Sequence, residues 1–250
     1  MASNEVAGAV AALWRFPVKS MLGERLDGAG VTGAGLVGDR AYALVEMATG
    51  TAVSAKRVQE FPDLFACRAA FVEPPQPGGG LPPVRITLPD GSAVTSDAGD
   101  ADATLSRWFG RDVHLASGPG FFDLYPISVL TTSTLDELDG LRPGSRFDER
   151  RFRMNVVVRT SGRGFVENAW VGRVLEVGDG VRLGVAMPDP RCVMTTLAQE
   201  ELPRDREILR TLSRHNRLEV GGEGRLPCCG VYAVVDAPGT IRAGDAVIVR

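Results

Sequence analysis

The sequence is poor in the residue types that mark several protein classes. Its 250 residues include two histidines and four cysteines, and only Lys19 and Lys56 are lysines. No pair of cysteines has zinc-finger spacing, and no apolar run reaches the ~18 residues of a membrane span. The net charge of −3 gives no sign of a nucleic-acid partner. The sequence therefore argues against zinc-finger, membrane-spanning and nucleic-acid-binding proteins.

What is present is typical of a soluble globular protein. Hydrophobic residues make up 44% and charged residues 24% of a chain long enough for one large domain or two modest ones. Nearly all positive charge is arginine, whose forked guanidinium suits phosphate where it faces a pocket. Cys228 and Cys229 are adjacent and cannot close a disulfide loop between them, so we expect reduced thiols. Residues 1–13 lack the basic cluster of a signal peptide, and we expect a cytoplasmic protein.

The first hundred residues predict an antiparallel sheet that closes toward a barrel. Apolar, strand-like segments cover 7–16, 41–47 and 65–72, and turn signals at 49–50 and 90–91 indicate hairpins. The glycine-rich segment 23–38 lacks the phosphate-loop and dinucleotide-binding patterns. It could serve tight turns or bring backbone amides close to an anion, and turns are the commoner role of glycine.

The second half predicts another mostly β unit with short helices. The expected elements are helices at 100–109, from the caps at 131–133 to 138, and at 204–215, strands at 151–160, 231–235 and 246–249, and a hairpin at 170–187. Gly140 is expected to end the second of these helices. Arg153 and Asn155 lie one step apart in the strand at 151–160, so their side chains are expected on one face. That face could also be an ordinary solvated strand end.

Cys192 stands on a segment that the sequence predicts to be stiff. It follows Pro188, Pro190 and Arg191, at the point where the strand-like run 181–187 stops. Proline fixes φ and removes a backbone donor, so the segment is expected to turn or to run along an edge. A guanidinium beside a thiol favours the thiolate, the form that binds metals or attacks as a nucleophile. A free cysteine is as often simply buried, so both interpretations stay open at this point.

Five short motifs, taken in order, resemble the MOSC proteins, and more specifically the molybdenum-cofactor enzymes similar to the amidoxime-reducing component and its bacterial relatives. The motifs are Pro17-Val18-Lys19-Ser20, Gly38-Asp39-Arg40, Arg153-Met154-Asn155, Pro190-Arg191-Cys192-Val193-Met194-Thr195-Thr196 and Pro238-Gly239-Thr240-Ile241. The resemblance implies a mostly β, α+β fold with a few short helices. It places an N-terminal β-barrel-like domain at 7–115 and a MOSC β-barrel domain at 116–250.

The resemblance also implies a pyranopterin-bound molybdenum, the molybdenum cofactor, whose single protein ligand is Cys192. A thiolate is a sensible ligand for a metal this soft. The anionic phosphate of the cofactor would need cations and hydroxyl or amide donors. The residues that match the family's cofactor contacts are Lys19, Ser20, Arg40, Arg153, Asn155 and Arg191, with Thr131 and Thr132 as a weaker match at a helix start.

The sequence departs from its relatives in three ways. Asp189 stands where relatives often carry a second cysteine. Its carboxylate would lie near the metal and relay protons, a catalytic role beside Cys192, or would face solvent. Met154 replaces a proline that is common in the motif. The ferredoxin domain of some bacterial relatives is missing, so electrons are expected from a separate ferredoxin, flavodoxin or cytochrome-type protein.

These observations support three hypotheses of function. The first is a molybdenum-dependent oxidoreductase that removes an oxygen atom from small N-hydroxylated or N-oxide compounds, with Cys192 fixing the coordination of the metal. The second is a sulfur carrier with a persulfide on Cys192, although related sulfurases add a pyridoxal-phosphate domain that this sequence lacks. The third is a cofactor carrier that binds the pterin without turnover.

Overall fold

A computed structural model describes residues 5–118, 121–122 and 124–250. The chain forms two compact units, and each is assembled from segments that are separate in the sequence. The barrel unit contains Met1–Trp14, Arg25–Leu36 and Leu124–Arg250, and the second unit contains Arg15–Glu24 and Val37–Asp123. The domain boundary expected between residues 115 and 116 stays a prediction.

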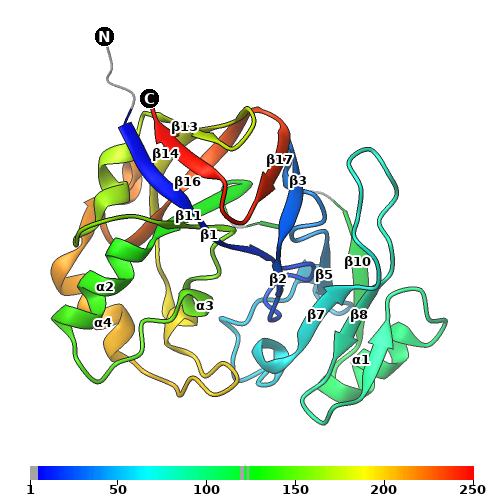
Figure 1. The fold of residues 1–250 in the computed structure, drawn as a ribbon. Coiled ribbons are helices and arrows are strands. Elements are labelled where there is room, and N and C mark those ends of the chain that lie inside the picture. The colour runs from blue at the N-terminus through cyan, green and yellow to red at the C-terminus, as the bar shows by residue number, and fades with distance from the viewer. Residues whose placement is uncertain (1–4, 119–120, 123) are drawn as a thin grey trace. The chain divides into compact units, whose positions relative to one another are not determined.

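The barrel unit is built on a closed ring of strands (Figure 1). Each strand pairs with the next in the order β11, β12, β1, β18, β13, β14 and β16, and β16 pairs back with β11. Closure removes the free edges that an open sheet would expose. The strands are β1 (Glu5–Arg15), β11 (Ile127–Thr131), β12 (Val156–Arg159), β13 (Val174–Val177), β14 (Val181–Pro190), β16 (Arg225–Ala237) and β18 (Ala246–Val249).

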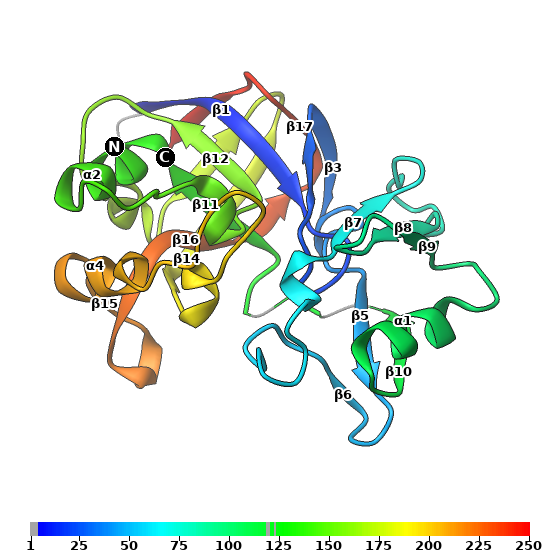
Figure 2. The ribbon, with the colours of Figure 1, turned by 90° about the horizontal axis from the view of Figure 1, so that it is seen from below.

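Short strands and three helices complete this unit. β2 (Glu24–Leu26) pairs with β1, β15 (Arg217–Glu219) pairs with β16, and β3 (Gly28–Thr32) pairs with both β4 (Gly35–Leu36) and β17 (Gly239–Arg242). The helices are α2 (Thr132–Leu141), α3 (Glu149–Phe152) and α4 (Glu207–His215). Figures 1 and 2 show α2 and α4 beside each other. No helix in the described part of the chain is long and apolar enough to cross a membrane.

The run Val156-Val157-Val158 explains how the barrel and its helices share a core. Side chains alternate along a strand, so Val156 and Val158 point to one face of β12 and Val157 to the other. Val156 and Val158 belong to one buried cluster, which also includes side chains of the other ring strands. Val157 belongs to a second buried cluster with Ile208 and Leu212 of α4. Those two residues are four apart and share a helix face, so α4 is held by the outer side of the ring.

The second unit contains two small antiparallel sheets and one helix. β5 (Tyr42–Glu46) pairs with β6 (Thr51–Ala52) and β10 (Val113–Ser117), and β8 (Val84–Thr87) pairs with β7 (Arg68–Phe71) and β9 (Ala93–Thr95). The two hairpins expected from the turn signals are confirmed. Helix α1 (Ala101–Phe109) ends at Gly110, which adopts the left-handed conformation with φ of +63°. Glycine reaches that conformation without a steric penalty, as expected for this helix end.

Two predictions about secondary structure near the motifs are wrong. Residues 149–152 form α3, capped by Asp148, so the strand expected at 151–160 begins only at Val156. Helix α2 continues through Gly140 to Leu141 instead of ending there. In both cases tertiary packing of short segments overrides the local signal.

The proline-rich end of β14 runs along an edge, one of the two outcomes that the sequence predicts. The strand does not stop before Pro188, because Pro188 pairs with Val231 and Pro190 with Cys228 of β16. On its other side β14 pairs with β13 only as far as Gly184. The prolines therefore lie where β14 has one neighbour, an edge that does not need their missing N–H donors. Register shifts in the pairing with β16 accommodate the fixed φ angles.

Closure of the ring between β11 and β16 depends on Gly230. Its φ is +80°, and a Cβ at this position would lie 2.6 Å from the carbonyl oxygen of Val129 and 2.4 Å from Cε of Met154. Met154 could shift, but the β11 backbone could not. We expect Gly230→Ala to lower the free energy of unfolding by more than about 2 kcal/mol, because it adds a left-handed alanine and a backbone clash.

Urea unfolding of Gly230→Ala beside Gly222→Ala checks this expectation. Gly222 has no heavy atom within 4 Å of a built Cβ and no left-handed φ. Its replacement should change the free energy of unfolding by less than about 0.5 kcal/mol. Equal effects of the two substitutions would contradict the role assigned to Gly230.

Candidate functional site

Cys192 lies two residues after the end of β14 and is the partly exposed member of the four cysteines, all of which lie in the described residues. Cys67, Cys228 and Cys229 are buried, whereas Cys192 is partly exposed. The carbonyl of Cys192 accepts hydrogen bonds from the amide of Thr195 at 3.2 Å and from its hydroxyl at 3.0 Å. The thiol therefore stands on a backbone that a tight 3-10 turn, Val193–Thr196, fixes on its C-terminal side.

A buried ion pair lies immediately before Cys192. Asp189 is 1% exposed, and its carboxylate pairs with the guanidinium of Arg191, whose side chain is 11% exposed. Burial alone would lower the pKa of Arg191, but the charge of Asp189 and weaker charges that include Cys192 raise it. The amide of Arg191 also donates to the carbonyl of Pro227 in β16 at 2.8 Å. Arg191 is thus a fixed cation next to the thiol.

Arg191 joins the Cys192 segment to the segment that carries Arg153. Its Nη2 donates to the carbonyl of Phe152 at 2.5 Å, and its guanidinium lies 5.9 Å from the centroid of the Phe152 ring. Arg153 follows as the C-cap of α3 in the left-handed conformation, with φ of +54°. The expectation that Arg153 and Asn155 share the face of one strand is therefore wrong, since Arg153 belongs to a helix end.

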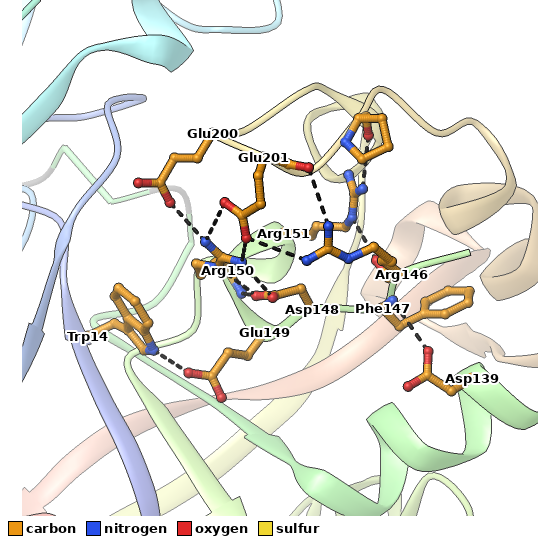
Figure 3. Close-up of polar contacts among 11 residues, drawn as sticks. Trp14, Asp139, Arg146, Phe147, Asp148, Glu149, Arg150, Arg151, Glu200 and Glu201 are labelled. Atoms are coloured by element: carbon orange, nitrogen blue, oxygen red, sulfur yellow. Dashed lines mark hydrogen bonds and ion pairs between the residues drawn. The ribbon is translucent and has the colours of Figure 1, made fainter. Parts of the chain in front are cut away.

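Arg151 ties the chain after Cys192 to the chain before Arg153 (Figure 3). Its side chain is fully buried, and it donates to three backbone carbonyls: Arg146 at 2.8 Å, Leu197 at 3.2 Å and Pro203 at 2.9 Å. Burial lowers the pKa of Arg151. The planar guanidinium of Arg151 thus donates hydrogen bonds to carbonyls from three separate turns of the chain.

Arg150, the neighbour of Arg151, forms a second set of polar contacts, which Figure 3 draws. Arg150 pairs with Asp148 at 2.7 Å, with Glu200 at 2.9 Å and with Glu201 at 2.6 Å. Hydrogen bonding to Arg150 lowers the pKa of Glu201 to about 2. Ion pairs between partly exposed residues contribute little to the free energy of folding, so the hydrogen bonds of Arg151 stabilise this region more than the ion pairs of Arg150 do.

Asn155 is built into the barrel wall. Its side-chain oxygen accepts from both the amide and the hydroxyl of Ser128 at 3.1 Å, and its Nδ2 donates to the carbonyl of Trp14 at 3.3 Å. The side chain is buried, with 1% exposure. Asn155 therefore links β11 to β1 across the start of β12.

Thr131 and Thr132 lie at the start of α2, as the sequence predicts. Thr131 is the N-cap and accepts from the amide of Thr134 at 3.3 Å. Its hydroxyl donates to the fully buried carboxylate of Glu167 at 2.6 Å, and the hydroxyl of Thr134 reaches the same carboxylate at 2.6 Å. Thr132 accepts from the amide of Thr160 at 3.2 Å. The hydroxyl of Thr131 is thus bonded to Glu167, and the expected phosphate contacts stay a prediction.

The other three motif residues belong to the second unit. The amide of Lys19 donates to the carbonyl of Tyr42 at 2.8 Å, and the amide of Arg40 donates to that of Phe16 at 2.8 Å, so the two motifs run side by side. Ser20 and Arg40 are both left-handed, with φ of +66° and +46°. The guanidinium of Arg40 lies 4.7 Å from the centroid of the Phe16 ring and forms a 2.5 Å ion pair with the carboxylate of Asp39. Nζ of Lys19 donates to the backbone carbonyl of Phe121 at 2.8 Å.

Sequence reasoning missed Arg151 and Glu167. Arg151 lies in a run of charged residues that is typical of a solvated segment. Glu167 stands between Val166 and Asn168 with nothing nearby in sequence to mark it as buried. Its partners come from α2, far away along the chain, so only the fold reveals it.

We expect Arg151→Met to destabilise the protein by more than about 2 kcal/mol, because it leaves three carbonyls without their donor. Arg150→Met is the matched control, since it removes an adjacent arginine of the same helix whose partners remain hydrated. Chemical unfolding of both variants provides the measurement. An Arg151 variant as stable as the Arg150 variant would show that the buried contacts do not hold the segment.

Glu167 predicts a pH dependence of stability. Burial raises its pKa above the ordinary value of 4.5, although the hydroxyls of Thr131 and Thr134 oppose the shift. A raised carboxyl pKa favours folding below pH 4.5, and this contribution is lost as pH rises toward the folded-state pKa. Between these values Glu167→Gln should therefore gain stability relative to wild type by up to about 1.4 kcal/mol per pH unit.

The check is urea unfolding of wild type and Glu167→Gln between pH 4.5 and 8. Glu176→Gln is the control, because a hydrogen bond from Arg250 lowers the pKa of Glu176 and its titration lies below this pH range, so its profile should run parallel to that of wild type. Parallel pH profiles of wild type and Glu167→Gln would contradict the assigned burial effect.

Comparison with known proteins gives two family matches and three informative relatives. The MOSC N-terminal beta barrel domain matches residues 7–110, and the MOSC domain matches residues 112–248. Mitochondrial amidoxime-reducing component 1 of Mus musculus is 34% identical over 131 residues, and that of Homo sapiens is 31% identical over 131 residues. Each match covers 51% of this chain and 37% of the relative, so the chain matches little more than a third of these relatives' length.

A solved structure supports the fold. The YUAD protein from Bacillus subtilis aligns with 100% of this chain and 98% of its own, with a TM-score of 0.55 and 15% sequence identity. The mostly β architecture with short helices is thus confirmed, as is the resemblance carried by the five motifs. Since the MOSC match alone spans more than half of the residues, this chain belongs to the MOSC domain family.

Proposed function

We propose that this protein is a molybdenum-cofactor oxidoreductase that removes oxygen from small N-hydroxylated or N-oxide compounds. The observation that carries the proposal is the partly exposed thiol of Cys192 next to Arg191, a cation held by the buried carboxylate of Asp189. The relatives named as amidoxime-reducing components support the substrate class, because an amidoxime carries an N–OH group.

The residues around Cys192 fit such a cofactor. Nε of Arg191 is buried and has no hydrogen-bond partner among the described residues, so it has a donor to offer. No three His, Cys, Asp or Glu side chains of the described chain form a group that could hold a metal ion. A metal on the Cys192 thiolate would therefore take its other ligands from the pterin or from water. Thiolate ligation suits a soft metal.

The net reaction defines what the chain must supply. Reduction of R–N–OH to R–N–H releases water and consumes two electrons and two protons. When bound, the molybdenum cofactor would accept the oxygen and pass on the electrons that a separate redox protein delivers. Cys192 would hold the metal, and Arg191 would keep positive charge beside it. Asp189 keeps Arg191 charged and oriented, and proton transfer through Asp189 is part of the proposal.

The remaining motif residues are proposed to bind the cofactor. Lys19, Ser20 and Arg40 would serve its phosphate and pterin with cations and a hydroxyl. Arg153, Asn155, Thr131 and Thr132 are also proposed to contact the cofactor. Support comes from chemistry: an anionic phosphate needs the guanidinium, ammonium and hydroxyl donors that these motifs bring.

The test is molybdenum content per chain after expression in a host that makes the cofactor. We expect near-stoichiometric metal in wild type and less than about one-tenth of it in Cys192→Ala, because a single thiolate is the protein ligand. Cys67→Ala is the control, since it removes a buried thiol that no motif includes. The loaded protein should reduce an amidoxime with an artificial electron donor.

Other results would replace the proposal. Molybdenum without reduction of any N-hydroxylated compound would indicate a cofactor carrier. No molybdenum, together with a reducible mass increase of about 32 Da on Cys192, would indicate a persulfide carrier. Equal metal in wild type and Cys192→Ala would remove Cys192 as the ligand.

A further inference from the structure

An arginine-rich face lies on α4 and the hairpin of β15 and β16. Residues 204–225 carry six arginines and four carboxylates, an excess of positive charge in a chain whose net charge is −3. All six arginines are exposed. Figure 2 shows α4 beside β15 and β16, and α4 packs against both strands. We call this surface the basic face. Its arginines are Arg204, Arg206, Arg210, Arg214, Arg217 and Arg225.

The charges of the helical part are not balanced internally. Glu207 of α4 pairs with Arg210 at 2.7 Å and with Arg142 at 3.6 Å. Its hydrogen bond with Arg210 and the charges of Arg142, Arg210 and Arg214 lower its pKa. Residues 204–214 thus carry four arginines and two carboxylates, an excess of two positive charges.

The hairpin part carries the arginines Arg217 and Arg225 and two glutamates, one of which, Glu219, lies opposite Arg225 in the strand pairing. Arg217 donates from Nε to the carbonyl of Arg225 at 3.1 Å, and Arg225 donates from Nη2 to the carbonyl of Arg217 at 2.8 Å. Neither forms an ion pair with any carboxylate of the described residues. Both guanidinium groups are exposed and can therefore pair with an external anionic group.

The basic face adjoins the Cys192 segment. Arg217 pairs with Pro227, and the carbonyl of Pro227 accepts from the amide of Arg191 at 2.8 Å. Neighbouring strands are about 4.8 Å apart, so the backbone of Arg217 lies roughly 10 Å from that of Arg191. Val193, next to Cys192, is 41% exposed and adds an apolar contact beside the charges. Helix α4 also packs against the turn Val193–Thr196, which begins directly after Cys192, so a protein bound to the basic face would be close to the Cys192 segment.

We infer that the basic face is the docking surface for an acidic electron-donor protein, which delivers electrons to a cofactor at Cys192. This inference rests on the proposed function. The charges extend over a helix and a hairpin, a span suited to a protein surface and too wide for one small anion. Charge complementarity of this kind raises association rates and orients the partner, and it weakens with salt.

The experiment uses the molybdenum-loaded protein and a reduced, strongly acidic [2Fe–2S] ferredoxin. The variant Arg217→Glu/Arg225→Glu should weaken ferredoxin binding at low salt by about tenfold or more, and wild-type affinity should fall steeply as salt rises. Amidoxime reduction with ferredoxin should fall in parallel. Molybdenum content and reduction with an artificial donor should not change, which separates this inference from the proposed function.

Two controls keep the inference falsifiable. Arg85→Glu/Arg107→Glu makes the same change in net charge at exposed arginines of the second unit and should leave ferredoxin binding within about twofold. Arg214→Glu tests the helical part without touching the hairpin and should weaken binding by itself. An equal loss of ferredoxin affinity in the basic-face and control variants would overturn the inference. Unchanged ferredoxin affinity in all of these variants would overturn it too. Preferential binding of duplex DNA over ferredoxin would overturn it as well.

Discussion

The close approach of β11 and β16 is the constraint on which the barrel unit depends. The ring has no free edge only because β16 can turn at Gly230 against the carbonyl of Val129. The same place organises buried polar groups, since the carboxylate of Glu167 accepts from the Gly230 backbone as well as from Thr131 and Thr134. One buried carboxylate therefore joins the closing strand to the start of α2. Such a group is costly to bury, and it is tolerated because every neighbour donates to it.

Hydrogen bonds from polar side chains also fix the Cys192 segment. Arg191 before the thiol bonds to the carbonyl of Phe152, and Arg151 bonds to the carbonyls of Leu197 and Pro203 beyond it. Arg151 is buried and Arg191 is mostly buried, and both side chains contact backbone that belongs to no regular strand. An apolar core could hold these turns with equal free energy, but it would not specify which carbonyl faces which donor. Buried cations define that geometry, so the position of the thiol is set by hydrogen bonds more than by packing.

Periodicity and turn chemistry were enough to predict most strands and helices, because alternating and 3.6-residue patterns reflect local physics. They failed where long-range contacts decide. The charged run at 149–153 is helical because Arg151 finds three carbonyls from distant segments, and β14 passes through its prolines because β16 pairs on one side only. The motifs identified residues by resemblance, yet the bond between Thr131 and Glu167 could not be read from sequence, since 36 residues separate the two.

Backbone strain gives an independent view of the same motifs. In the described chain, four residues other than glycine have left-handed φ angles: Ser20, Arg40, Arg153 and Glu200. For an ordinary residue this conformation costs about 1 kcal/mol or more, and it persists only where surrounding structure holds it. Glu200 forms an ion pair with Arg150. The other three are residues that the motifs assign to the cofactor. A left-handed residue turns the backbone so that its own side chain and the next amide point in directions that a helix or strand forbids. The strain therefore marks positions where the direction of a side chain matters more than stability, which agrees with the cofactor contacts proposed for Ser20, Arg40 and Arg153.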